Sequence, residues 1–203
     1  CRRAGAWGEA IDLLRRMAER GLPPNSYAYS TAVSACADGG DWVRALQLLE
    51  EMAARGAAPS VHAYAAAIRA CDRGGAHRQA LKLLLRTMPR RGVRANDYAW
   101  NAAISACARA AEWRLALGLR GRMESGRRGA PPPNIYSYNS ALSACDRASE
   151  WRAAHAIYES MGRLGVPPDR VSDNALLSAY ARVGRWRESL AHLDGVQHLG
   201  RVH

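Results

Sequence analysis

A repeat of about 35 residues runs through the whole chain and constrains its fold more than any other feature. The rare residues reveal the period, because the five cysteines lie 35, 35, 36 and 38 residues apart. The five methionines follow the same rhythm, and five of the six tryptophans occupy one position of the repeat. A period of roughly 20 to 50 residues is the signature of proteins in which small structural units stack. We therefore expect a linear array of units.

We call each position within the repeat a slot and count Ser26 as slot 1, which divides the chain into six units. The first unit begins at slot 11 and the last ends at slot 34. The units are residues 1–25, 26–60, 61–96, 97–134, 135–169 and 170–203. We interpret residues 1–203 as a single domain, and we expect it to be a segment of a longer repeat protein.

Each unit carries two apolar stripes with the spacing of amphipathic helices. They fall at slots 4, 7, 8 and 11 and at slots 17, 20, 21, 24 and 27, with Arg120 as an exception. In unit 26–60 the stripes include Tyr29, Val33, Cys36, Trp42, Leu46, Leu49 and Met52. Glycines or short Ala/Ser pairs separate the helices, and a Gly closes most units. One hairpin cannot bury both stripes alone, so the sequence predicts an all-α solenoid of tandem helix-turn-helix repeats.

Two units are longer than the others, because 61–96 has 36 residues and 97–134 has 38. The extra residues are assigned to the stretches MPRRGVRAN and ESGRRGAPPPN, which end these units and are rich in Arg, Gly and Pro. Insertions are tolerated in connecting segments. Both stretches are therefore predicted to be lengthened loops between hairpins.

The cysteines are evenly spaced on one helix face, and the chain has no Cys-x-x-Cys pair. We interpret them as small buried residues with free thiols. They form neither a disulfide framework nor a metal site in this interpretation. No metal and no cofactor are predicted.

The charge indicates a polyanionic partner. The net charge is +11, and every cation except Lys82 is arginine. Nucleic acid and an anionic membrane both fit such a surface. No apolar run approaches the ~20 residues of a membrane span, and no helix has the pattern of a membrane-surface helix. A membrane partner is therefore not expected.

One arginine per unit recurs at slot 13, where only Asp38 interrupts the series. These arginines are Arg3, Arg73, Arg109, Arg147 and Arg182. A single surface arginine is usually only solvated. A regular ladder of guanidinium groups suits the phosphates of a nucleic-acid backbone, and we predict that these residues contact them.

Three further slots fall along the face away from the core. Slot 2, predicted to stack on bases, reads Tyr27, His62, Tyr98, Tyr136 and Val171. Slot 5 reads Ser30, Ala65, Asn101, Asn139 and Asn174. The last slot of each unit reads Asn25, Ser60, Asn96, Asn134 and Asp169. The alternative is that slot 2 caps the helix start, that the last slot is an ordinary N-cap and that slot 5 holds an exposed residue without a specific role.

The sequence resembles the pentatricopeptide repeat family along its entire length. The resemblance rests on the first helices YAWNAAISACARAAEW and YSYNSALSACDRASEW, on the second helix ALQLLEEM and on the closing G-x-x-P-[N/D]. The period of 35, with Pro near slot 34, separates it from the 34-residue tetratricopeptide pattern. It implies a right-handed superhelical α-solenoid that binds single-stranded RNA inside organelles, with the chloroplast favoured over the mitochondrion.

The resemblance also implies that slot 5 and the last slot select the base while slot 2 sandwiches it. Asn139 with Asp169 resembles the uracil-preferring pair, and Asn101 with Asn134 resembles a pyrimidine pair that favours cytosine. Asn174 suggests another pyrimidine, with its partner beyond the chain. The pairs Ser30–Ser60 and Ala65–Asn96 depart from the well-defined pairs and leave their bases open.

No enzymatic activity is expected. The chain lacks an H-x-E motif followed by C-x-x-C, a Walker-type glycine loop and a cluster of carboxylates. His192, His198 and His203 are interpreted as surface residues.

Two hypotheses remain. The first is a monomeric, sequence-selective binder of single-stranded RNA that acts in organelle RNA processing, stabilisation or expression by occupying a site, and that can place RNA-processing protein factors. The second is an α-solenoid scaffold that holds an acidic peptide or protein in the same groove. The rings at slot 2 and the amides at slot 5 favour RNA.

Overall fold

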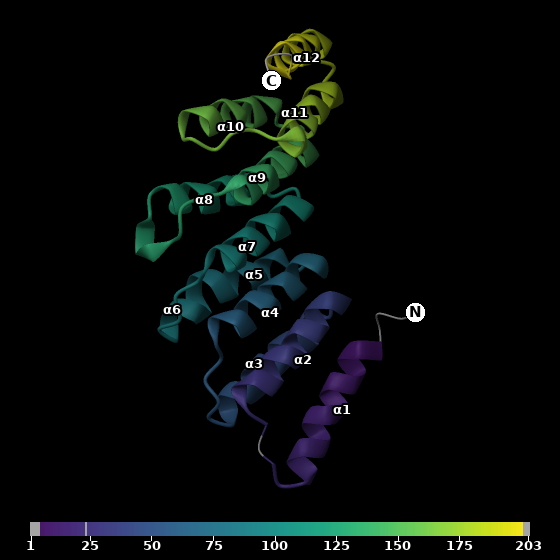
Figure 1. The fold of residues 1–203 in the computed structure, drawn as a ribbon, viewed down its shortest axis with the longest axis vertical. Helices are drawn as coiled ribbons and strands as arrows, with labels where there is room; N and C mark the ends of the chain where they lie inside the picture. The colour runs from purple at the N-terminus through teal and green to yellow at the C-terminus, as the bar shows by residue number, and fades with distance from the viewer. Residues whose placement is uncertain (1–4, 23, 201–203) are drawn as a thin grey trace.

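The computed structural model describes residues 5–22 and 24–200, and within these ranges the chain consists of helices joined by short turns, without a strand (Figure 1). The first helices of the units are α2 (Ser26–Gly39), α4 (Val61–Arg73), α7 (Asp97–Arg109), α9 (Ile135–Arg147) and α11 (Arg170–Arg182). The second helices are α1 (Gly5–Glu19), α3 (Trp42–Ala54), the run of α5 (His77–Lys82), η1 (Leu83–Thr87) and α6 (Met88–Arg90), then α8 (Trp113–Glu124), α10 (Trp151–Arg163) and α12 (Trp186–Gly200).

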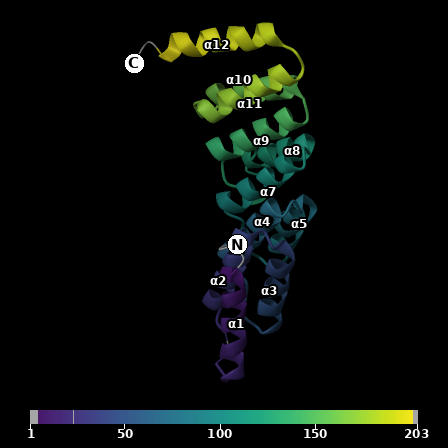
Figure 2. The same ribbon diagram turned by 90° about the vertical axis from the view of Figure 1, so that its right-hand side faces the viewer.

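The hairpins stack in chain order, so that α1 and α12 lie at opposite ends of the array (Figure 2). Each first helix packs against the first helix of the next unit, in the order α2, α4, α7, α9 and α11, and against the second helix of its own unit. This arrangement is an all-α solenoid, which confirms the predicted fold class. No helix in the described part of the chain is long and apolar enough to cross a membrane.

The core lies where the stripes of adjacent hairpins meet. The first-helix stripe is buried as predicted, with Tyr29, Val33 and Cys36 at most 1% exposed. The second-helix stripe is rotated from the prediction, because the residue at slot 23 is buried in place of the one at slot 21. Leu48 is buried at slot 23, whereas Leu46 at slot 21 is only partly covered. The second helix is therefore rotated about its axis so that slot 23 faces the core.

The cysteines of the described units are Cys36, Cys71, Cys107 and Cys145, and all four are buried and free. Burial raises the pKa of the Cys71 and Cys145 thiols to about 12 and that of the Cys107 thiol to about 11. Thiols with such pKa values stay protonated and inert at neutral pH. Their predicted role as small core residues is confirmed.

The prediction that unit 61–96 has a lengthened loop is wrong. The extra residue is accommodated inside the second helix, where Leu83–Thr87 forms one π-helical turn. Ala80 before this turn and Leu83 and Leu84 at its start repeat the buried pattern of α3, and after the turn Met88 returns to the core at 0% exposure. The π turn is the means by which a helix absorbs one inserted residue without losing the register of its apolar face.

The extension in unit 97–134 is a loop, as predicted. It follows α8 and contains the short 3-10 helix η2 (Arg127–Gly129). The loop folds back toward the preceding unit, because Arg94 Nε donates a hydrogen bond of 3.1 Å to the carbonyl oxygen of Gly129. The two irregular units therefore touch each other at their connecting segments.

Arg120, a polar residue that breaks the pattern, is held by specific partners. Arg120, the exception in the apolar stripe, lies 5.1 Å from the centroid of the Tyr138 ring and 3.4 Å from a carboxylate oxygen of Glu124. Its Nη1 also donates to Ser160 Oγ at 3.2 Å in the next unit. The guanidinium therefore joins two hairpins.

The interpretation of His192 as a surface residue is wrong. Its Nε2 lies 3.2 Å from Asp173 Oδ1, and its ring meets the Tyr158 ring edge-on at 4.8 Å between centroids. Tyr158 also donates its hydroxyl to Asp173 Oδ1 at 2.6 Å. The side chain of His198 and the whole of His203 lie outside the described residues.

Candidate nucleic-acid interface

The last residue of each unit caps the first helix of the next. The side-chain oxygen accepts a hydrogen bond from the backbone N–H three residues later, at distances between 2.9 and 3.3 Å. The capping residues are Asn25, Ser60, Asn96, Asn134 and Asp169. The cap accounts for the residue types at this slot, in line with the alternative stated above. It leaves the rest of each side chain available for another contact.

The structure brings slot 5 and the following cap together in two units. Asn139 Nδ2 donates to the Asp169 carboxylate at 3.1 and 3.3 Å, and Asn139 Oδ1 accepts from Ser172 Oγ at 2.6 Å. Asn101 Nδ2 donates to Asn134 Oδ1 at 3.2 Å. Each pair is therefore fixed in position by its own hydrogen bonds.

The two pairs differ in charge and in whether all of their hydrogen-bonding atoms have partners. Hydrogen bonds from the Ser172 backbone N–H, and then from the Asn139 and Ser172 side chains, hold the pKa of Asp169 below its usual value. Asp169 is therefore a carboxylate at neutral pH. Asn101 Oδ1, in contrast, is buried without a hydrogen-bond partner. An unpaired buried acceptor costs free energy, because its hydrogen bonds to water have been lost without replacement.

The remaining slot 5 and cap residues are not joined in this way. Ser30 donates its hydroxyl to the carbonyl of Ser26 in its own helix, at 2.8 Å. Ala65 is buried at 6% exposure and has no polar group to offer. Asn174 is exposed, and no following cap lies within the described residues.

The slot 2 side chains stand on the open face of the solenoid. Tyr27, Tyr98 and Tyr136 are between 64% and 80% exposed, Val171 is 57% exposed and His62 is also exposed. They do not cap the helices, because the residue two positions earlier does so. These exposed rings recur once per unit along one face, where they are available for stacking.

One cleft of about 430 Å³ is lined by predicted residues of three successive units. Tyr136 and Val171 from slot 2 line it together with the Asn139 and Asp169 pair. Arg147 lines it as well, beside Arg109 and several serines. The cleft has a flat or apolar group on either side of a hydrogen-bonding pair and a cation at its margin. These groups are suited to the base and the phosphate of one nucleotide.

Most of the slot 13 arginines are engaged within the protein. Arg109 Nε lies 2.9 Å from Asp72 Oδ1, and Arg182 Nε lies 2.8 Å from Asp146 Oδ1. Arg73 Nη1 lies 3.4 Å from Asp38 Oδ1. Each pair joins one unit to the next, and each partly neutralises the predicted ladder. Arg3 lies outside the described residues.

Arg147 differs from these three arginines. The residue across from it, at the place that Asp72 and Asp146 hold in other units, is Ala108. Within the described part of the chain Arg147 has no ion pair, and it is exposed at the edge of the cleft. Its charge is therefore the most available of the series.

Sequence reasoning missed a set of inter-unit contacts at slots 9 and 12. Ser105 Oγ donates to both carboxylate oxygens of Asp72 at 3.1 Å, and Ser178 Oγ donates to Asp146 Oδ1 at 2.8 Å. The signal was present, because an Asp at slot 12 is followed in the next unit by both a Ser at slot 9 and an Arg at slot 13. The described residues contain no group of His, Cys, Asp or Glu that is suited to a metal ion.

A stack of helical hairpins with hydrogen-bonding pairs along one open face defines the class of helical-repeat binding proteins. A family model described as the pentacotripeptide-repeat region of PRORP matches residues 15–199, and a PPR repeat model matches residues 1–22. The chain belongs to the pentatricopeptide repeat family. No curated protein matches it.

Solved structures of the family share the fold. The pentatricopeptide repeat protein PPR10 from maize is 27% identical, with a TM-score of 0.77, over 98% of this chain and 28% of that one. PPR10 in complex with an 18-nt psaJ RNA element is 25% identical, with a TM-score of 0.68, over 98% of this chain and 32% of that one. The PPR domain of Arabidopsis thaliana protein-only RNase P 1, in complex with tRNA, is 19% identical with a TM-score of 0.67, over 84% of this chain and 88% of that one. The chain therefore spans about a third or less of the PPR10 chains.

Proposed function

We propose that this chain binds single-stranded RNA, with one base held between successive units. The observation that carries the proposal is the cleft in which Tyr136 and Val171 flank the Asn139–Asp169 pair, with Arg147 at its edge. The RNA complex of PPR10, a relative with the same fold, supports it. Each base would stack on slot 2 side chains and form hydrogen bonds with the pair between them.

Base selection follows from the pairs. Asp169 is an acceptor at neutral pH and Asn139 is held against it, an arrangement that we assign to uracil by resemblance to the family. Asn101 and Asn134 are assigned to a pyrimidine, with cytosine favoured. The remaining pairs stay without a base assignment.

Phosphate contacts are assigned to the slot 13 arginines, with Arg147 foremost because its guanidinium has no ion pair within the described residues. Arg73, Arg109 and Arg182 share their charge with carboxylates, but Arg109 and Arg182 keep about half of their side-chain surface exposed, at 54% and 50%. They can reach a phosphate only in competition with those carboxylates.

We further propose that the protein is a monomer that acts by occupying its RNA site, without catalysis of its own. Occupancy can shield a transcript, remodel it or position an RNA-processing factor. An organelle is the proposed location, with the chloroplast favoured over the mitochondrion, by resemblance to the family alone. The scaffold hypothesis, with an acidic protein in the groove, is retained as an outcome of the test below.

The test is a titration of the chain with pyrimidine-rich and purine-rich single-stranded RNAs at several salt concentrations. Asn139→Ala should weaken the preference for uridine at one position of the RNA and leave the salt dependence unchanged. Arg147→Ala should weaken binding to all sequences and reduce the slope of log K against log salt by about 0.7. Arg109→Ala is a less direct probe, because it also removes the partner of Asp72.

Arg78→Ala is the matched control, because Arg78 is exposed on the second helix of its unit and has no ion pair among the described residues. It removes the same charge away from the cleft. Equal losses for Arg78→Ala and Arg147→Ala would mean that only net charge matters. Binding no stronger than that of a generic basic protein, or an unchanged base preference in Asn139→Ala, would favour the scaffold hypothesis.

A further inference from the structure

The two units of irregular length border a second cavity, of about 510 Å³. One wall comes from the π turn and the segment that follows it, and the other comes from α7, the end of α8 and the η2 loop. The lining residues are Leu84, Leu85, Pro89, Gly92, Val93, Arg94, Ala95, Trp100, Arg122, Arg127 and Gly129. None of them lines the cleft around Asn139. Single π turns inside α-helices occur frequently at functional sites.

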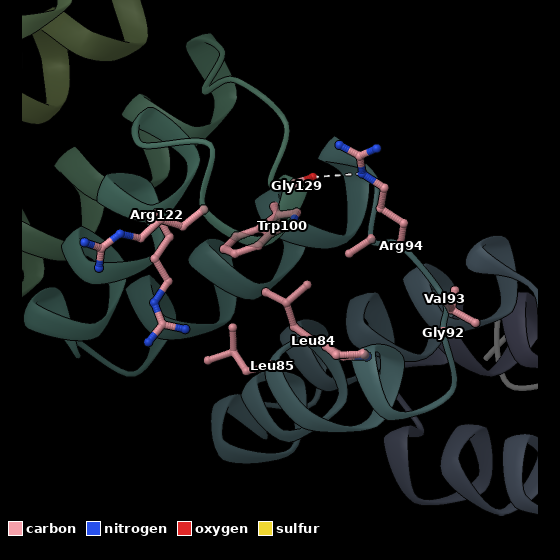
Figure 3. A pocket seen from close by; sticks show the side chains of 11 residues that line it. Leu84, Leu85, Gly92, Val93, Arg94, Trp100, Arg122 and Gly129 are labelled. Carbon is pink, nitrogen blue, oxygen red and sulfur yellow. Dashed lines mark hydrogen bonds between the residues drawn. The ribbon is translucent and has the colours of Figure 1, made fainter.

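The floor of this cavity is apolar and its rim is basic (Figure 3). Trp100, Leu84 and Leu85 lie in the middle, with Arg94 on one side and Arg122 on the other. Trp100 is 7% exposed and Leu84 is 2% exposed, so the floor belongs to the rigid core. A pocket of a few hundred Å³ with an apolar floor and a few convergent polar groups is the usual form of a ligand site.

Arg94 is positioned by the backbone of the opposite wall. Its Nε donates to the Gly129 carbonyl at 3.1 Å. A Cβ at position 129 would lie 2.8 Å from Arg94 Nε, and Gly129 also has a positive φ of 72°. The glycine therefore permits the close approach that holds the guanidinium at the rim.

The rim has positive charge without internal compensation. Among the described residues no carboxylate forms an ion pair with Arg94, Arg122 or Arg127, whereas Arg109 and Arg182 each have an aspartate within 3 Å. Three uncompensated guanidinium groups around one apolar floor create a local positive potential that attracts carboxylates or phosphates.

We propose that this cavity binds an acidic peptide segment of a partner protein, with one bulky apolar side chain seated on the Leu84, Leu85 and Trp100 floor. Carboxylates on either side of that anchor pair with Arg94, Arg122 and Arg127. This floor favours a side chain over a nucleotide base, because the Trp100 ring is only 7% exposed and the cavity has no side-chain amide for reading a base edge. The site is independent of the RNA function proposed above.

The experiment measures binding of a fluorescein-labelled peptide in which a single Trp is flanked by Glu and Asp on both sides. Two control peptides replace the Trp by Ser or the acidic residues by Gln and Asn. The unmodified chain should bind the first peptide more tightly than either control. The double variant Arg122→Glu/Arg127→Glu should lose at least about tenfold in affinity, because two ion pairs become two repulsions.

The matched control is Arg16→Glu/Arg163→Glu, which makes the same charge change at two exposed arginines far from the cavity and should change affinity less than about twofold. Leu85→Gln tests the floor and should remove the advantage of the Trp peptide over the Ser peptide. Helical circular dichroism and melting confirm that each variant is folded. Equal weakening by both double variants would overturn the proposal, since binding would then follow net charge alone. Competitive displacement of the peptide by uridine-rich RNA would also overturn it and assign the cavity to the RNA path.

Discussion

We expect the inter-unit aspartates to oppose RNA binding while they stabilise the array, and Asp72→Asn separates these two effects. Asp72 accepts hydrogen bonds from Ser105 Oγ at 3.1 Å and lies 2.9 Å from Arg109 Nε. The asparagine oxygen can still accept a hydrogen bond from the Ser105 hydroxyl, so the substitution removes mainly the negative charge at position 72. Arg109 then has a free guanidinium beside the cleft that also contains Arg147.

The size of the expected stability change follows from the exposure of the Asp72–Arg109 ion pair. The side chain of Arg109 is 54% exposed and that of Asp72 is 11% exposed, so water screens the ion pair only in part and the pair contributes up to about 1 kcal/mol to the free energy of unfolding. We expect Asp72→Asn to lower the stability by no more than about 1 kcal/mol, or about 2–4 °C in Tm for a chain of this size. We expect the affinity for single-stranded RNA to rise roughly twofold to fivefold, with a salt slope steeper by about 0.7.

The assay pairs thermal melting with RNA titration at several salt concentrations on the same preparations. Glu159→Gln serves as the control, because Glu159 is an exposed carboxylate on α10 without an ion pair in the described residues. It makes the same charge change away from the cleft and should leave Tm and the salt slope almost unchanged. A fall of affinity together with stability in Asp72→Asn would refute the reasoning, since Asp72 would then position Arg109 for RNA instead of competing for it.

Three further predictions concern the fold and the caps. Gly74→Ala should destabilise the array by more than about 1 kcal/mol, measured by urea unfolding, because its Cβ would lie 2.4 Å from Trp42 Cδ1 and 2.6 Å from a backbone oxygen. Ser149→Gly should raise the free energy of unfolding by about 0.5–1 kcal/mol, since Ser149 has a φ of 59° that glycine adopts without strain; an unchanged or lower urea midpoint would count against this. Hydrogen bonds hold the pKa of Asp169 below its usual value, so its cap stabilises the fold above the unfolded pKa of about 4 and is lost as the pH falls through the lower folded value. The difference in stability between the unmodified chain and Asp169→Asn should therefore shrink below pH of about 4, and a constant difference would contradict the assignment.

Much of the fold could be predicted from the repeat. The first-helix stripe, the buried cysteines and the loop after α8 agree with the prediction, because they depend on periodicity and on local turn residues. The π turn was missed, although the spacing contained its signal. Cys36 to Met52 is 16 residues, whereas Cys71 to Met88 is 17. The extra residue therefore had to lie before Met88, inside the second helix, and not in the loop behind it.

The candidate site was readable in part. Its residue positions follow from the period, and the structure brings Asn139 and Asp169 together at 3.1 Å. Their roles in base selection stay predictions, because a cap and a base contact use the same side chain. The charge of the ladder could not be judged from slot 13 alone, since the carboxylates that neutralise Arg109 and Arg182 belong to slot 12 of the preceding unit.

The sequence by itself determined the repeat, the helical hairpins and the face on which each slot lies, because a fixed period places equivalent residues in equivalent positions. Only the tertiary structure decided which of the predicted groups are free to act. Arg109 and Asp72 are 37 residues apart and Arg182 and Asp146 are 36 apart, yet stacking brings each pair within 3 Å. Arg147 is left without such a partner because Ala108 stands across from it. The energy of a charge depends on its neighbours in space, and stacking supplies neighbours that lie one full unit away in the chain.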